Sequence, residues 1–205
     1  GSTNTGTLSS ASNNTGVGWG VFNSLTSGLD NTATGYSALF NNTTGYMNTA
    51  IGKDALRSNT TGWWNVANGK AALMTNTTGK GNVAIGYHAL YLNTTGEYNT
   101  ATGRDALRSN TTGSNNVAYG NVALYTNTTG SYNTATGQSA LQNNTTGENH
   151  TAIGYNSLMH NTTGQNNTAT GYESLKSNTT GSYNSAYLCR TSEGNFFQIR
   201  MLHQH

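Results

Sequence analysis

The chain has 205 residues, of which 33% are apolar and 8% charged, with no proline and a net charge of +2 at pH 7. So few apolar residues exclude an ordinary globular core. The basic residues are scattered along the chain and no apolar stretch is long enough to cross a membrane, so we expect neither nucleic-acid binding nor membrane insertion.

A 17-residue unit repeats ten times without a gap over residues 14–183. The unit reads N-T-A-x-G-x-x-A-L-x-x-N-T-T-G-x-x, and its positions are numbered 1 to 17 from Asn14. A short fixed period predicts a solenoid, because a disordered chain would not keep its few apolar residues at constant spacing. Residues 1–13 are predicted to be a lead-in or partial coil, and residues 184–205 a partial coil followed by an aperiodic cap or tail.

We expect an all-β fold, a parallel β-solenoid with one coil per 17-residue unit and ten coils. N-T-A-x-G predicts a short strand in which positions 2 and 4, mostly Thr, Val or Ile, point away from the side taken by the alanine of position 3. Glycine occurs at position 5 in all ten units, which predicts a corner that needs positive φ or a close approach of neighbouring backbones. With coils about 4.8 Å apart, the rod is roughly 48 Å long.

The second half of the unit predicts a second strand and a second corner. The Ala-Leu pair of positions 8 and 9 supplies the strand, and N-T-T-G supplies a turn whose Asn and Gly suit left-handed conformations. Asparagine columns at positions 1 and 12 are expected to bond amide to amide along the rod. The nine N-T-T triplets are also formal N-glycosylation sequons, although repeated turn chemistry is the favoured interpretation.

The apolar content of one coil is too small to stabilise it alone. One coil buries little more than one alanine and one leucine, worth about 2–3 kcal/mol, far less than the cost of ordering the residues of the unit. We therefore expect positions 2 and 4 to form an interface between chains. The residues predicted for this inter-chain interface are Ile51, Val66, Val83, Ile85, Val117 and Ile153.

No catalytic arrangement is found in the sequence. Asp54 and Asp105 lie three units apart, too far for a catalytic carboxylate pair. The five histidines lack a metal-ligand spacing. We therefore expect no enzyme activity, no metal and no cofactor. Cys189 is the single cysteine, so it cannot form a disulfide within the chain.

Aromatic residues occupy several of the variable positions of the unit. The pair Trp63 and Trp64, with Tyr46 one unit earlier, is predicted to lie at a corner and to bind ligand as a sugar-stacking platform. Packing of the same rings across a subunit boundary is the alternative interpretation.

The strings Asn48-Thr49-Ala50-Ile51-Gly52 and Asn82-Val83-Ala84-Ile85-Gly86, each followed by x-x-A, resemble the head repeats of YadA-like trimeric autotransporter adhesins. Similar arrays occur in phage-type tail-fibre proteins. The resemblance implies a left-handed parallel β-roll that forms a homotrimer, with Val83, Ile85 and their equivalents facing the partner chains. The adhesin unit is typically shorter, which makes the N-T-T-G corner of this chain an enlarged loop.

The residues and the resemblance together predict a structural and adhesive segment of an extracellular surface fibre or tail fibre, with cell-surface glycans as candidate ligands. The alternative is a homopolymer, a filament subunit that stacks end to end with the aperiodic tail as the junction. A lesser alternative is an ice-binding solenoid, suggested by threonine pairs such as Thr32/Thr34 and weakened by Tyr119 on the same face.

Overall fold

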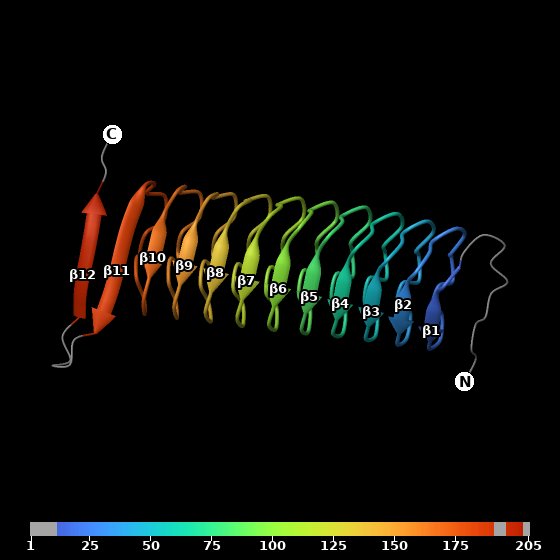
Figure 1. Ribbon diagram of the computed structural model, residues 1–205. Helices are drawn as coiled ribbons and strands as arrows, with labels where there is room; N and C mark the ends of the chain where they lie inside the picture. Colours follow the sequence, from blue (N-terminus) through green and yellow to red (C-terminus); the bar gives the residue numbers. More distant parts are fainter. Residues whose placement is uncertain (1–11, 191–195, 203–205) are drawn as a thin grey trace.

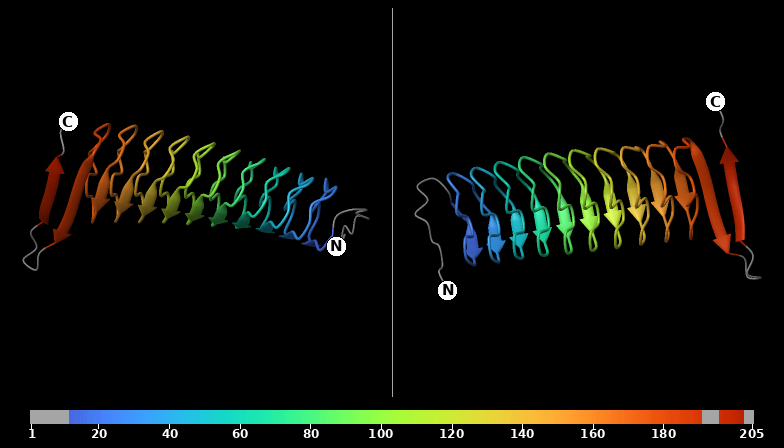
Figure 2. Two further views of the ribbon diagram at one scale, coloured as in Figure 1. Left: turned by 45° about the horizontal axis from the view of Figure 1, so that its top comes forward. Right: turned by 180° about the vertical axis from the view of Figure 1, so that it is seen from behind.

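The structure is a computed structural model that describes residues 12–190 and 196–202, with side chains described as far as Tyr187. It is a β-solenoid in which every coil carries one strand on the same side of the rod (Figures 1 and 2). No helix occurs among the described residues. The remainder of the predicted lead-in, residues 1–11, and the side chains of the predicted cap lie outside the described part of the chain.

The sheet follows the order of the sequence, and its strands recur every 17 residues. This confirms the all-β parallel solenoid with one coil per unit. Each short strand pairs with the strand of the next unit, and equivalent positions of the two units lie opposite one another. The ten short strands are β1 (Thr15–Val17), β2 (Thr32–Thr34), β3 (Thr49–Ile51), β4 (Val66–Asn68), β5 (Val83–Ile85), β6 (Thr100–Thr102), β7 (Val117–Tyr119), β8 (Thr134–Thr136), β9 (Thr151–Ile153) and β10 (Thr168–Thr170).

The C-terminal end of the sheet departs from the parallel pattern. β11 (Asn184–Arg190) continues the ladder by pairing parallel with β10. β12 (Phe196–Leu202) then pairs antiparallel with β11. The edge that a parallel solenoid would otherwise present after β11 is therefore occupied by β12, which limits further strand pairing at this place.

The core is a narrow column of alanine and leucine. Alanine of position 3 and the Ala-Leu pair of positions 8 and 9 are fully buried in nearly every coil, as Ala101, Ala106 and Leu107 illustrate. Serine replaces alanine at position 8 near the C-terminal end, and Ser157 Oγ donates a hydrogen bond to the carbonyl of Ala169 at 3.0 Å. The core therefore stays free of unpaired polar groups even where the repeat varies.

The predicted second strand at positions 8 and 9 is wrong. Every leucine of position 9 has a φ of 49–51°, which is the left-handed region and interrupts a strand. The chain turns at this leucine: the N–H of Asn59 donates to the carbonyl of Leu56 at 3.1 Å, while the N–H of Leu56 donates to Ala72 in the next coil at 3.0 Å. A left-handed non-glycine residue costs about 1–2 kcal/mol, and burying the leucine side chain recovers a similar amount.

The N-T-T-G corner also differs from its prediction. Neither its asparagine nor its glycine has positive φ; the left-handed residues are at positions 7, 9 and 17 instead. The glycine is required for space, since a Cβ on Gly113 would collide with the carbonyl of Gly130 in the next coil. The glycine of position 5 meets both predicted requirements: Gly103 has a φ of +134°, and a Cβ there would lie 2.5 Å from the carbonyl oxygen of Gly120.

The two predicted asparagine ladders are confirmed. At position 1, Asn65 Nδ2 donates to Asn48 Oδ1 at 3.1 Å and to the carbonyl of Gly79 at 2.9 Å. At position 12, Asn59 Nδ2 donates to Asn42 Oδ1 at 2.7 Å and to the Gly62 carbonyl at 2.9 Å. Asn42 to Asn161 of the N-T-T triplets are fully buried. With both Nδ2 hydrogens engaged, these sequons are structural in the folded chain, as the turn interpretation expects.

Candidate functional site

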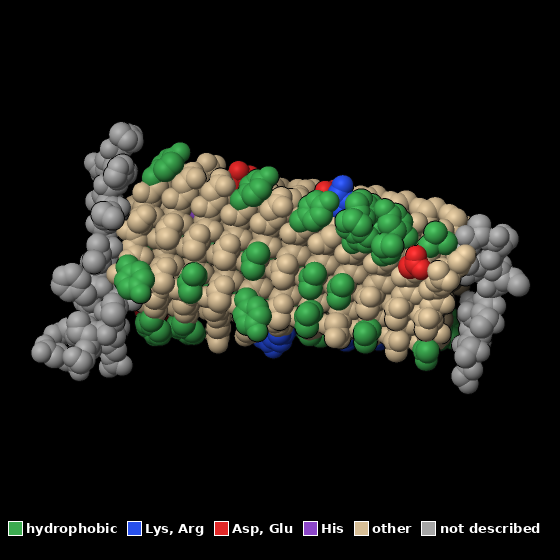
Figure 3. Space-filling model, in the orientation of Figure 1, with side chains coloured by type: hydrophobic (Ala, Val, Ile, Leu, Met, Phe, Trp, Pro, Cys, Tyr) green, Lys and Arg blue, Asp and Glu red, His purple; other side chains and the backbone are tan. Residues whose placement is uncertain are grey.

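The strand face, defined here as the outward side chains of positions 2 and 4, is the first exposed surface. Ile51, Ile85, Val117 and Ile153 are each 41–42% exposed, and Val66 and Val83 are half-buried between their neighbours. Figure 3 shows apolar side chains spaced along the middle of this face. The structure thus brings the six residues predicted for the inter-chain interface together on one continuous surface.

The strand face is not a flat threonine array. Threonine pairs such as Thr32/Thr34 are separated by coils that carry valine or isoleucine. Tyr119 is 60% exposed in the middle of the face. Its protruding ring breaks the flat surface that matching to an ice lattice requires.

The Trp corner, defined as positions 16 and 17 of the second to fourth coils, is the second surface. Tyr46 and Trp63 stack with their ring centroids 5.5 Å apart and their planes 6° from parallel. On the opposite side, Lys80 Nζ lies 5.2 Å from the centroid of Trp63. The ring centroids of Trp63 and Trp64 are 4.6 Å apart and their planes meet at 79°, which is an edge-to-face contact. The structure therefore brings the three predicted ligand-binding residues into one cluster, which forms the large apolar group at the upper right of Figure 3.

Within the Trp corner the rings differ in how far their faces are covered. Both faces of Trp63 are covered, by Tyr46 and by Lys80, so the perpendicular contact must set the edge of Trp63 against a face of Trp64. Trp64 itself is 53% exposed. Its indole N–H donates to Met47 Sδ at 3.0 Å. Trp64 is therefore the most exposed ring on which a sugar could stack, and its indole N–H is already engaged.

The basic edge, defined as positions 6, 7 and 10, is a third surface that the sequence interpretation missed. Six of the seven Lys and Arg residues with described side chains occupy positions 6 or 10, together with several aromatic rings; Lys80, at position 16, is the exception. Figure 3 shows basic side chains along the lower margin of the rod. Sorting the cations by repeat position, instead of reading them in chain order, would have revealed the grouping. The six are Lys53, Arg57, Lys70, Arg104, Arg108 and Lys176.

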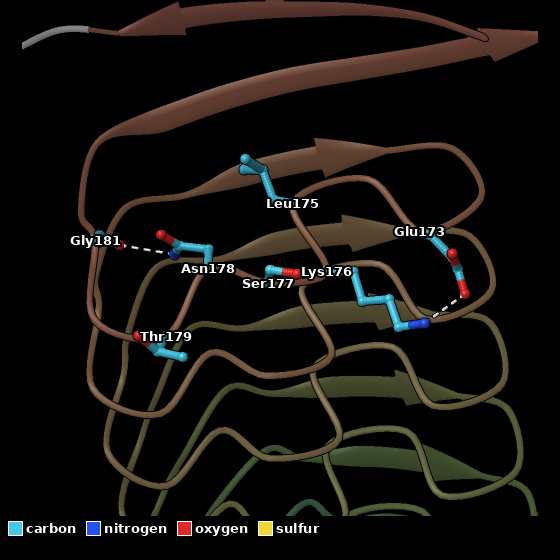
Figure 4. Close-up of a pocket in the computed structure, with 7 residues that line it drawn as sticks. All are labelled: Glu173, Leu175, Lys176, Ser177, Asn178, Thr179 and Gly181. Atoms are coloured by element: carbon cyan, nitrogen blue, oxygen red, sulfur yellow. Dashed lines mark hydrogen bonds and ion pairs between the residues drawn. The ribbon is translucent and has the colours of Figure 1, made fainter.

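An open recess of about 570 Å³ lies at the end of the tenth coil (Figure 4). In earlier coils the N–H groups of positions 9, 11 and 13 donate to the next coil, as Leu158, His160 and Thr162 do. In the tenth coil the corresponding groups of Leu175, Ser177 and Thr179 have no acceptor among the described residues. β11 and β12 extend the sheet but leave this row of donors open.

An ion pair lies at the rim of the same recess. Lys176 Nζ lies 2.6 Å from Glu173 Oε1, and this hydrogen bond lowers the pKa of Glu173 and raises that of Lys176. Both side chains are about one-third exposed at the surface, so the pair contributes little to stability.

His150 replaces asparagine in the position-1 ladder and reproduces most of its bonds. Its backbone N–H donates to Asn133 Oδ1 at 3.0 Å, and its Nδ1 accepts the N–H of Asn167 at 3.2 Å. Its Nε2 lies 3.0 Å from Asn161 Nδ2, and the ring also bonds the backbone of Gly164. Burial lowers the pKa of His150 below its ordinary value of 6.5, because desolvation disfavours the charged imidazolium.

Replacing His150 with asparagine is expected to stabilise the solenoid by about 1 kcal/mol at neutral pH and to flatten its acid dependence. Below pH 6.5 the unfolded chain protonates this histidine before the folded chain does, so the free energy of unfolding falls as the pH falls. Urea unfolding at several pH values measures both effects. His160→Asn is the matched control, because His160 is half-buried at position 11, where Asn143 stands in the preceding coil. An unchanged pH slope in His150→Asn would contradict a neutral buried imidazole.

The described residues contain no group of three or more His, Cys, Asp or Glu side chains that could hold a metal. Within the same part of the chain, no helix is long and apolar enough to cross a membrane. Comparison of the chain with protein-family models, with curated proteins and with solved structures gives no match.

Proposed function

We propose that the chain is a non-enzymatic structural and adhesive segment of an extracellular fibre, a surface fibre or tail fibre, in which the solenoid is a stiff spacer. The observation that carries the proposal is the strand face: Ile51, Ile85, Val117 and Ile153 stay two-fifths exposed on a chain that is otherwise very polar. Apolar side chains in a continuous row on a regular surface favour association with further copies of the same surface.

The dimensions of the strand face limit how strongly two copies can associate through it. A rod of roughly 48 Å and a three-residue strand of about 10 Å give about 500 Å² of contact surface. A stable pairwise interface buries about 800 Å² per partner, so two copies joined only by this face would associate weakly. A trimer around one axis likewise buries about 500 Å² of this face per chain, so the choice of three copies is made on the resemblance to YadA-like adhesins, which implies a homotrimer.

Replacing Val83 and Ile85 together with aspartate is expected to reduce the assembly to monomers, because the interface would bury charges without partners. The solution mass, measured at two protein concentrations, is the test. Thr95→Asp with Thr112→Asp is the matched control, since it adds the same charges at exposed sites away from the strand face. A double variant that keeps the parent mass would show that Val83 and Ile85 face solvent in the assembly.

A filament that grows end to end is the second candidate function. It is favoured by the open N–H groups of Leu175, Ser177 and Thr179, which a coil of another copy could satisfy. β12 stands against it, because it occupies the sheet at the same end of the rod. A mass that rises without limit with concentration would support the filament, whereas a fixed trimer supports association through the strand face.

The adhesive part of the proposal rests on surfaces outside the coil framework. The asparagine ladders, corner glycines and core residues are all engaged in building the coil, so a ligand can be recognised only at the variable positions. Trp64 and the basic edge are the two candidates that the geometry offers.

A further inference from the structure

We propose that the basic edge of the third to sixth coils binds an acidic polysaccharide. The inference rests on the adhesive part of the proposed function and does not depend on how many chains associate. Its starting point is the gathering of Lys53, Arg57, Lys70, Arg104 and Arg108 on one side of the rod.

The basic edge concentrates the charge of the whole chain. Its five cations face only two carboxylates, Asp54 and Asp105, which leaves a net charge of +3 over four coils, whereas the entire chain carries +2. Four coils span about 14 Å along the rod. A local positive potential of this kind attracts polyanions in a manner that salt weakens.

Aromatic rings hold the cations at regular places. Lys53 Nζ lies 5.4 Å from the centroid of Tyr36, and Lys70 Nζ lies 5.6 Å from that of Tyr87. Arg108 lies between two rings, and its Nη1 donates to the hydroxyl of Tyr125 at 3.1 Å. Because these contacts order long side chains before any ligand arrives, less conformational entropy is lost on binding.

The ring geometry favours a polysaccharide over a nucleic acid. Single-stranded nucleic acids bind by stacking bases on open ring faces. On the basic edge those faces are covered: Tyr36 lies between Trp19 and Lys53, and Tyr87 between Lys70 and His88. Tyr36 and Tyr87 remain 49% and 43% exposed.

The free parts of these residues match the groups of an acidic sugar chain. Tyrosine hydroxyls both donate and accept hydrogen bonds and therefore suit sugar hydroxyls. The ammonium and guanidinium groups suit carboxylate or sulfate.

The test is a binding titration of the full chain with four probes: alginate, which carries carboxylates, dextran sulfate, neutral dextran and a single-stranded oligothymidine. We expect binding to alginate or dextran sulfate that weakens as salt is added, and none to neutral dextran. Alginate and dextran sulfate separate carboxylate from sulfate as the recognised group. No binding to either acidic glycan, or equal or tighter binding to the oligothymidine, would overturn the proposal.

Variants locate the site. Lys53→Gln, Lys70→Gln and Arg104→Gln combined should lower affinity about tenfold or more. All three side chains are exposed, and glutamine stands at the same position as Gln138, so the coil accepts it. Lys80→Gln is the matched control, because Gln165 occupies its position in another coil. Trp64→Ala tests the Trp corner as the alternative binding site.

Two outcomes of the variant series would overturn the inference: retained affinity in the triple variant, or a loss confined to Trp64→Ala, which would place the glycan at the Trp corner. Melting curves and solution masses of every variant are recorded alongside. If the chains do not associate but still bind the acidic glycan, only the proposed fibre function is refuted. If the chains associate but bind no acidic glycan, only the proposed polysaccharide site is refuted.

Discussion

Replacing Gly103 with valine is expected to destabilise the solenoid by at least about 4 kcal/mol, enough to unfold the coils around it. Gly103 has a φ of +134°, a conformation that residues with a Cβ rarely adopt, and a Cβ there would lie 2.5 Å from the carbonyl oxygen and 2.7 Å from the carbonyl carbon of Gly120. The obstructing atoms are backbone, so no side-chain rotation can relieve the overlap. Thermal and urea unfolding followed by circular dichroism measure the loss.

Gly81→Asn is the control for Gly103→Val. Gly81 also has positive φ, +64°, but asparagine already occupies the same position as Asn115, with a φ of 59°. The new side chain would meet only the exposed ring of Tyr98, which can move. We expect this variant to stay within about 1 kcal/mol of the parent. A parent-like melting curve for Gly103→Val would contradict the close approach of coils at position 5.

The parts of the fold that the sequence predicted are those where a residue type has a narrow set of uses. An invariant glycine at position 5 has few explanations, and Gly103 shows both of the predicted ones. Asparagine at a fixed spacing of one unit predicts a ladder, and Asn48 and Asn65 form it. Leu56 was missed because leucine normally avoids left-handed φ, so neither propensity nor alternation reveals the turn. The stacking of identical coils stabilises a conformation that one coil alone would not hold.

Of the candidate surfaces, the one that depends on a single strand was predicted, whereas the contacts between coils that shape the others were not. Alternation along the strand placed Val83 and Ile85 outward correctly, because a strand has a period of two. The covered faces of Trp63 depend on residues one unit away on either side, Tyr46 and Lys80. The basic edge likewise depends on neighbours across coils. In a solenoid the contacts of a side chain come from the adjacent units, so charge and aromatic content are informative only when summed by repeat position.

Replacing Asn110 with leucine is expected to cost at least about 3 kcal/mol. Asn110 Nδ2 donates to Asn93 Oδ1 at 2.8 Å and to the Gly113 carbonyl at 2.9 Å, and its Oδ1 accepts from Asn127 Nδ2 at 2.9 Å. Leucine satisfies none of these three bonds. Each buried polar group left without a partner costs about 1–3 kcal/mol, which exceeds the gain from burying leucine in a site shaped for an amide.

Asn41→Leu is the control for Asn110→Leu, because Asn41 is exposed and Leu92 occupies the same position in another coil. It should unfold within about 0.5 kcal/mol of the parent. If Asn110→Leu and Asn41→Leu unfolded at the same temperature, the asparagine ladders would make no net contribution to the free energy of unfolding. The coils would then depend on one alanine column and one Ala-Leu column, whose burial is too small to order them. The strand-face association would in that case have to hold the fold together, and Val83→Asp with Ile85→Asp would unfold the chain instead of releasing monomers.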